Sequence, residues 1–189
     1  ATLRQKEAIA AAAKLGIAAE DVLFLKVKDG QLTDSQPLAI EQVAAILCQY
    51  RPEEVYVPYY LDPHPDHLGT NTAVMQALQT TDHSAIVWEY PVWFWHHWPW
   101  IHLPADGLKK NGWKEILKAN LKLMRDFNHS VYIGDLVEPK REALNQHASQ
   151  VTRLVPDPEW FTLGDVSDGD FLNCFFQDYE IFYCHGSKT

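Results

Sequence analysis

A stiff, ionisable turn constrains the fold of this chain more than any other feature of its sequence. The apolar run at residues 55–60 is followed by Asp-Pro-His-Pro-Asp-His at residues 62–67. Each proline fixes its own φ and pushes the residue before it out of the helical region. An apolar run that ends in such a turn is typical of a strand whose carboxyl end borders a ligand site in an α/β protein.

Apolar runs and helical patterns alternate along the rest of the chain. Alternation of strands with helices favours a mostly parallel sheet with helices on both faces. At 189 residues, without an internal repeat or a linker, we expect a single α/β domain. The patterns predict helices over 2–15, 37–50, 69–78, 113–126 and 139–151, and strands over 22–27, 55–60, 85–88, 130–134 and 171–183.

The composition argues against several classes of partner. The net charge is −9, from 25 acidic and 16 basic residues, and no basic run is present. Nucleic acid and anionic membrane surfaces are therefore not expected partners. The most apolar stretch, residues 93–103, is too short to span a bilayer. Three cysteines without a CxxC pair, and the lack of a signal-peptide pattern, predict a cytoplasmic protein.

The turn carries side chains that suit metal-assisted chemistry. One of His64 and His67 could bind a divalent metal while the other serves as an acid–base or oxyanion partner. The alternative is that both only cap a helix or satisfy backbone groups of the turn. Asp66 could orient an imidazole or cap the next helix, and Asp62 could do either. A zinc site takes about three protein ligands, and this turn supplies one or two.

The turn resembles the second signature of the LmbE-like (PIG-L) zinc-dependent N-deacetylases, in which Asp-x-His-Pro-Asp-His lies between a strand and a helix. That family removes acyl groups, mostly acetyl, from amino sugars and related glycosyl amines. The resemblance implies a Rossmann-like three-layer α/β fold. Weaker motifs resemble the same family in the same order: Arg4-x-x-Glu7, Asp29-Gly30-x-Leu32, Lys140-x-x-Ala143-Leu144-x-x-His147-x-Ser149-Gln150 and Tyr179-Glu180-x-Phe182.

The resemblance also implies roles for individual residues. His67 would be a zinc ligand, and His64 would stabilise the tetrahedral oxyanion or protonate the leaving amine. Asp66 would assist catalysis by orienting a histidine. Arg4 and Asp29 match positions that contact the sugar in some members of the family.

A cluster of tryptophans follows the third predicted strand. Aromatic faces stack on the apolar faces of pyranose rings, so we expect Trp93 and Trp95 to contribute to substrate binding. The alternative is a core or oligomer contact, because clustered aromatic residues also mark interfaces. A homo-oligomer is therefore possible.

The family's first signature, Ala-His-Pro-Asp-Asp-Glu, is not in this sequence. In the family it supplies two zinc ligands and the carboxylate base. We therefore expect an N-terminally incomplete LmbE-like domain over residues 1–189, with the first strands absent. The alternative is that a separate polypeptide or a swapped neighbour supplies them. The predicted function is zinc-dependent removal of an N-acetyl group from an amino sugar such as an N-acetylglucosamine derivative. The alternatives are a catalytically incomplete sugar-binding or interaction domain, and a phosphoesterase, which usually needs more carboxylates and histidines.

Overall fold

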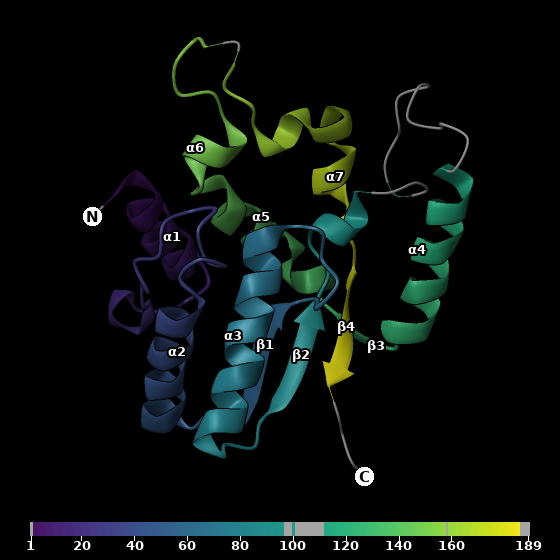
Figure 1. The fold of residues 1–189 in the computed structure, drawn as a ribbon. Coiled ribbons are helices and arrows are strands. Elements are labelled where there is room, and N and C mark those ends of the chain that lie inside the picture. Colours follow the sequence, from purple (N-terminus) through teal and green to yellow (C-terminus); the bar gives the residue numbers. More distant parts are fainter. Residues whose placement is uncertain (1, 97–99, 101–111, 158, 186–189) are drawn as a thin grey trace. The chain divides into compact units, whose positions relative to one another are not determined.

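The computed structural model describes residues 2–96, 100, 112–157 and 159–185, and within these ranges the chain is mixed α/β with a four-stranded sheet of order β1-β2-β4-β3 (Figure 1). The strands are β1 (Glu54–Pro58), β2 (Ile86–Tyr90), β3 (His129–Tyr132) and β4 (Tyr179–His185). The helices are α1 (Leu3–Lys14), α2 (Gln36–Tyr50), α3 (Pro65–Thr81), α4 (Gly112–Asp126), α5 (Val137–Asn145), α6 (Ala148–Val151) and α7 (Asp170–Asn173).

The chain divides into two compact units, and each is described by itself. The first unit comprises Ala1–Phe24, Trp95–Ile116 and Val131–Glu180. The second unit comprises Leu25–Phe94, Leu117–Ser130 and Ile181–Thr189. The turn from Asp62 to His67 lies in the second unit.

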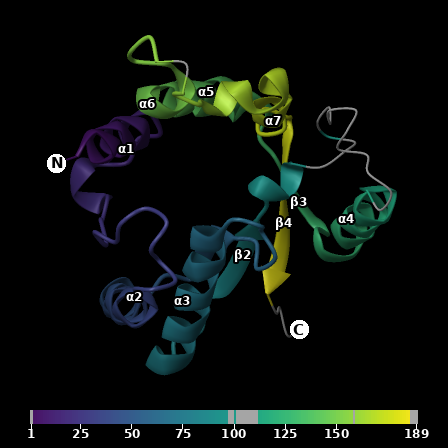
Figure 2. The same ribbon diagram turned by 45° about the horizontal axis from the view of Figure 1, so that its top comes forward.

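The second unit is built around a β-α-β crossover. β1 and β2 pair in parallel, with Val55 opposite Val87 and Val57 opposite Glu89. α3 connects the two strands, as a parallel pair requires. α2 and α3 lie side by side (Figure 1, Figure 2) and help to cover the strands. The core of this unit is aliphatic and is formed by Leu47, Val57, Val74, Ala77, Leu78 and Val87.

Hydrogen bonds and an ion pair connect elements of the first unit. The carboxylate of Glu7 in α1 accepts hydrogen bonds from the backbone N–H and the hydroxyl of Ser149 in α6, each at 2.7 Å. Lys140 in α5 pairs with Glu180 at the start of β4, at 2.6 Å. All four residues belong to the weaker motifs noted in the sequence. These motif residues therefore bind one another within the first unit, which gives them a structural role.

The helices follow the predictions closely. α1, α2 and α4 agree with the predicted ranges to within a residue at each end. α3 begins at Pro65, four residues before the prediction, because proline suits the first helical position. The helix predicted over 139–151 is interrupted at His147, whose φ of −79° and ψ of 53° are not helical.

Two predictions about strands are wrong. Residues 22–27 form no strand, and Lys26 has a φ of +58°, which an extended chain cannot hold. Residues 171–183 were predicted to be strand-like. Instead, residues 171–173 belong to helix α7, and β4 begins only at Tyr179. Both segments are apolar, but apolar content alone cannot distinguish a strand from a loop or a short helix.

The prediction of a mostly parallel sheet is also wrong, because the four-stranded sheet is mostly antiparallel. β2 pairs with β4 in the antiparallel direction, with Val87 opposite His185 and Glu89 opposite Tyr183. Phe182 of β4 packs edge-on against Tyr56 and Trp88 of the parallel pair. This aromatic packing stabilises β4 beside β2, and the order of elements in the sequence does not reveal it.

Glu7 makes the stability of the first unit dependent on pH. Its hydrogen bonds from the hydroxyl and the amide of Ser149 lower the pKa of the Glu7 carboxyl below its ordinary value of 4.5. The stabilisation is therefore fully present above pH 4.5 and is lost as the pH falls through the lower pKa of the folded state. We predict that Glu7→Gln lowers stability at neutral pH and flattens this acidic loss, as measured by urea unfolding across the pH range.

Glu142 provides the matched control for this prediction. Its side chain is 66% exposed and lies 3.8 Å from Lys14. An exposed ion pair of this kind contributes little to the free energy of unfolding. Glu142→Gln is expected to follow the wild-type pH profile. An unchanged profile for Glu7→Gln would show that the contact with Ser149 does not stabilise the unit.

Candidate active site

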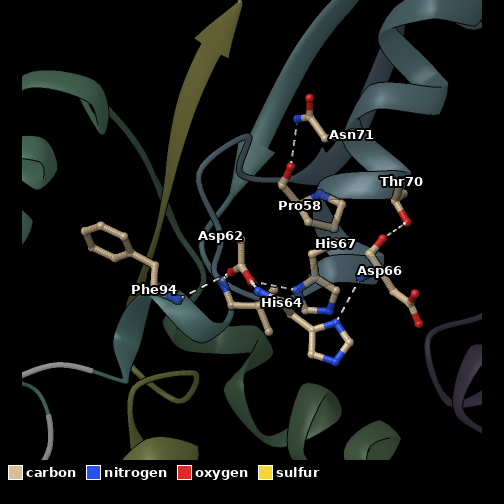
Figure 3. A network of polar contacts seen from close by, with 9 residues as sticks. Pro58, Asp62, His64, Asp66, His67, Thr70, Asn71 and Phe94 are labelled. Carbon is tan, nitrogen blue, oxygen red and sulfur yellow. Dashed lines mark hydrogen bonds and ion pairs between the residues drawn. The ribbon is translucent and has the colours of Figure 1, made fainter. Parts of the chain in front are cut away.

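The ionisable turn lies between the end of β1 and the start of α3 (Figure 3). A backbone hydrogen bond from Asp62 N–H to Tyr59 O, at 2.9 Å, closes the chain reversal after the strand. His64 is the N-cap of α3, and Pro65 follows it at the first helical position. Both histidines are therefore held at one end of the parallel strand pair, as the sequence predicted.

Asp62 is the centre of this turn. Its side chain is fully buried, at 0% exposure. One oxygen, Oδ1, accepts from the His64 backbone N–H at 3.2 Å and contacts the His67 ring at 3.0 Å. The other oxygen, Oδ2, accepts from the backbone N–H of Val92 at 3.1 Å. It also accepts from the backbone N–H of Phe94 at 3.4 Å (Figure 3). A buried carboxylate is tolerated only when its oxygens are satisfied in this way.

The charge state of Asp62 follows from these contacts. Burial acts to raise the pKa of the Asp62 carboxyl, but the hydrogen bonds from the His67 ring and from the His64 and Val92 amides together outweigh it. The pKa of Asp62 therefore lies below its ordinary value. At neutral pH the group is a carboxylate that accepts hydrogen bonds and donates none.

The carboxylate of Asp62 sets the tautomer of His67. Because Asp62 only accepts, the Nδ1 atom of His67 carries the proton in their 3.0 Å contact. In the neutral ring, the Nε2 atom of His67 then keeps its lone pair. A histidine that is fixed by a carboxylate through one nitrogen and offers the other is the usual form of a zinc-binding histidine.

His64 has the opposite tautomer. Its Nδ1 atom accepts a hydrogen bond from the backbone N–H of Asp66 at 3.3 Å, so its proton lies on Nε2. The His64 and His67 rings are neighbours, with centroids 4.8 Å apart and planes tilted by 40°. The turn thus places a ring that can donate a hydrogen bond through Nε2–H beside a ring that can bind a cation.

Asp66 connects the turn to the loop that contains Asp29. Its carboxylate accepts hydrogen bonds from the backbone N–H groups of Gly30, at 2.6 Å, and Leu32, at 3.2 Å. The carboxylate that contacts a histidine ring is that of Asp62, a role that the sequence left open. Asp29 is exposed on the loop that Asp66 holds. The catalytic assignment of Asp66 and the substrate-binding assignment of Asp29 stay predictions.

Gly69 allows this loop to approach α3 closely. A Cβ atom at Gly69 would lie 3.1 Å from the side chain of Leu32, which is tighter than ordinary packing. The backbone oxygen of Gly69 also accepts a hydrogen bond from the side-chain amide of Gln36, at 2.9 Å. The side chain of Asp66 therefore binds one end of the loop to the start of α3, and the side chain of Gln36 binds the other end to Gly69.

Trp93 lies next to the turn, on the short 3₁₀ segment Trp93–Trp95 that follows β2. Its ring is nearly parallel to that of His64, with an interplanar angle of 16° and centroids 6.4 Å apart. The amides on either side of Trp93 are the two that bind Asp62. The structure therefore brings one of the two predicted sugar-stacking residues to the candidate site.

Two other predicted substrate-binding residues belong to the first unit. Arg4 is exposed on α1, and the Trp95 ring contacts that of Trp100 at 5.3 Å between centroids. Their assignment to substrate binding stays a prediction. Much of the tryptophan-rich segment, residues 97–99 and 101–111, lies outside the described residues.

The sequence analysis did not identify two buried polar residues that support the turn. Asn71 of α3 donates to the backbone oxygen of Pro58, at 2.9 Å, and so fixes the helix to the end of β1 (Figure 3). Glu89 of β2 is fully buried and accepts from the Tyr60 backbone N–H at 2.7 Å. A charged residue inside the apolar run Ile86–Tyr90 was the signal that could have revealed Glu89.

The described residues fit one ligand of a metal site. The tautomer and the carboxylate partner of His67 suit zinc. In the parts of the chain that the structure describes, no group of three or more His, Cys, Asp or Glu residues is arranged to hold a metal ion. A zinc site takes about three protein ligands, so His67 alone would not complete one.

Comparison with known proteins agrees with the resemblance seen in the sequence. The family model for PIG-L, GlcNAc-PI de-N-acetylase, matches residues 1–78 of the 189. This range contains the motif at Arg4, the loop at Asp29 and the whole turn. No curated protein matches the chain. The predicted resemblance is confirmed over that range, and at the level of the family it supports a de-N-acetylase-type hydrolase.

The contacts of Asp66 lead to a test of local order. We predict that Asp66→Ala increases hydrogen exchange at the amides of Gly30 and Leu32, because each loses its carboxylate acceptor. Asp29→Ala is the control, since its side chain lies on the same loop and is exposed. Equal protection of both amides in Asp66→Ala and in wild type would contradict the assigned role.

Proposed function

We propose that this chain contributes the turn of a zinc-dependent N-deacetylase that removes an acetyl group from an N-acetylated amino sugar or glycoside. The observation that carries the proposal is the 3.0 Å contact between His67 Nδ1 and the buried Asp62 carboxylate. The family match over residues 1–78 supports the reaction class. We further propose that the β1-α3-β2 crossover is part of a Rossmann-like three-layer domain spanning residues 1–189.

His67 would hold the metal through Nε2. Zinc, when bound, lowers the pKa of a coordinated water and polarises an acyl carbonyl. The hydrogen bond to the Asp62 carboxylate would keep the His67 ring from turning and would hold Nε2 ready to bind a metal. The general base and the remaining ligands would be other residues.

His64 would act on the acyl oxygen. Its Nε2–H can donate a hydrogen bond to the oxyanion that forms when water adds to the amide carbonyl. When the tetrahedral species collapses, the C–N bond breaks and the amine nitrogen takes up a proton, which the general base can supply after it has taken that proton from the attacking water. The Asp66 amide holds His64 in the tautomer that presents Nε2–H to the oxyanion.

The substrate class rests on the surroundings of these histidines. Trp93 offers an aromatic face beside His64, which suits the apolar face of a sugar ring. The exposed carboxylate of Asp29, on the loop that Asp66 holds, could accept hydrogen bonds from sugar hydroxyls. We also propose that the protein is cytoplasmic and that it can form a homo-oligomer.

A sugar-binding domain without catalysis is the second candidate. It is favoured by one observation, that the described residues offer one oriented ligand and no group of three. Such a domain would use Trp93 and Asp29 in the same way but would neither bind zinc tightly nor release acetate.

Substitution of His67 separates these two functions. We predict that the full chain binds zinc, and that His67→Ala weakens zinc binding by at least about 100-fold, since it removes a ligand. His64→Ala is expected to leave zinc binding unchanged and to lower acetate release from N-acetylglucosamine derivatives by about 100-fold to 1000-fold. Equilibrium dialysis with zinc and an acetate assay measure the two effects independently.

His129→Ala is the matched control, because His129 is exposed and its ring contacts Trp88, away from the turn. It should retain both zinc binding and activity. Sugar binding by a wild-type chain that binds no zinc would favour the second candidate. Zinc binding that survives in His67→Ala would contradict the ligand assignment.

A further inference from the structure

Helix α4 carries a stripe of apolar side chains on its exposed side. Leu117, Leu121 and Met124 follow one another at intervals of four and three residues, which places them on one face of the helix. Their exposed fractions are 52%, 58% and 81%. Large apolar side chains in a contiguous exposed row indicate an interaction surface more often than scattered ones do.

A buried carboxylate fixes which side of α4 faces inward. Asp126 lies nine residues after Leu117, two and a half helical turns on, and therefore on the opposite side of the helix. It is 5% exposed and accepts a hydrogen bond from the hydroxyl of Tyr59. Tyr59 is itself fully buried in the second unit. The apolar stripe, on the other side, thus faces away from this anchor.

A basic ridge runs beside the apolar stripe. Lys118, Lys122 and Arg125 are also spaced by four and three residues, so they form a second row along the helix. Lys118 is exposed, Lys122 is half-buried, and the side chain of Arg125 is 67% exposed while it pairs with Asp126. In a chain of net charge −9, this segment concentrates positive charge next to exposed apolar groups.

We propose that residues 117–125 bind the surface of a bilayer that contains anionic phospholipids. The apolar stripe would enter the boundary between headgroups and acyl chains, and the basic ridge would contact the headgroup phosphates. Helices that lie in the plane of a membrane combine these two features. Within the described parts of the chain, no helix is both long and apolar enough to cross a bilayer.

The net charge of the chain does not prevent this interaction. Charges farther away than about 8–10 Å are largely screened at physiological salt, so the local charge of α4 decides contact with a surface. The charge of the whole chain predicts no binding to anionic membranes, whereas the local charge of α4 favours it. Membrane binding through α4 does not depend on the proposed deacetylase activity.

Charge favours a lipid surface over a second copy of the chain. A two-fold pair of α4 helices would bring the same patch of each copy together. Packing of the apolar stripes would then place each basic ridge beside the ridge of the other copy, and juxtaposed like charges oppose association. Anionic headgroups complement the ridge instead.

Vesicle co-sedimentation of the full chain tests the proposal. We expect binding to phosphatidylcholine vesicles that contain about 30% phosphatidylserine, weakening as salt rises, and little binding to phosphatidylcholine alone. Leu121→Gln with Met124→Gln should reduce binding by at least about tenfold. Lys118→Gln with Lys122→Gln should reduce it by about fivefold for each charge.

A matched pair of substitutions on another surface of the second unit provides the control. Leu38 is 50% exposed and Lys28 is exposed, so Leu38→Gln with Lys28→Gln removes similar groups and should leave binding unchanged. The proposal is overturned if wild type does not bind anionic vesicles, or if both α4 variants bind as wild type does. A concentration-dependent dimer that the Leu121 and Met124 substitutions abolish would assign the stripe to a second copy and would also overturn it.

Discussion

The candidate site depends on one buried carboxylate, that of Asp62. Its two oxygens receive four hydrogen-bond donors from three segments of the chain: the turn itself, the start of α3 and the segment after β2. Without a carboxylate at this position, the Val92 and Phe94 amides would lose their acceptor in a water-poor environment. Asp62 thus joins the ends of two parallel strands and, in doing so, determines how His67 is presented.

The other contacts of the turn reinforce this arrangement. Asn71 fixes α3 to the end of β1, and Asp66 fixes the loop at residues 29–32 to the start of α3. The ring of His64 accepts a hydrogen bond from the backbone N–H of Asp66, the first residue of α3 that has one. The functional groups are therefore positioned by backbone groups of neighbouring segments, which makes the turn rigid before any ligand binds.

The sequence predicted the parts of the structure that depend on neighbouring residues. The helices were found because their patterns are local, and the turn was found because two prolines, two histidines and two aspartates fall within six residues. The failures concern partners that lie far apart. Residues 22–27 have the composition of a strand but no partner strand in the described chain, and the direction of β4 depends on packing of Phe182 against Trp88.

The roles of the two aspartates in the turn illustrate the same limit. Sequence alone could not decide between Asp62 and Asp66, because the donors that distinguish them lie about thirty residues away, at Val92 and Phe94 for one and at Gly30 and Leu32 for the other. Family resemblance pointed to Asp66, whereas the contacts place the Asp62 carboxylate on the histidine ring.

The tautomers of the two histidines test this account most directly. Nitrogen-15 NMR of the labelled chain at about pH 8.5, well above the ordinary pKa of histidine, distinguishes a protonated ring nitrogen from an unprotonated one. The account predicts the proton on Nδ1 in His67 and on Nε2 in His64. A His67 ring that carries its proton on Nε2 would contradict the contact with Asp62 and, with it, the proposed presentation of a metal ligand.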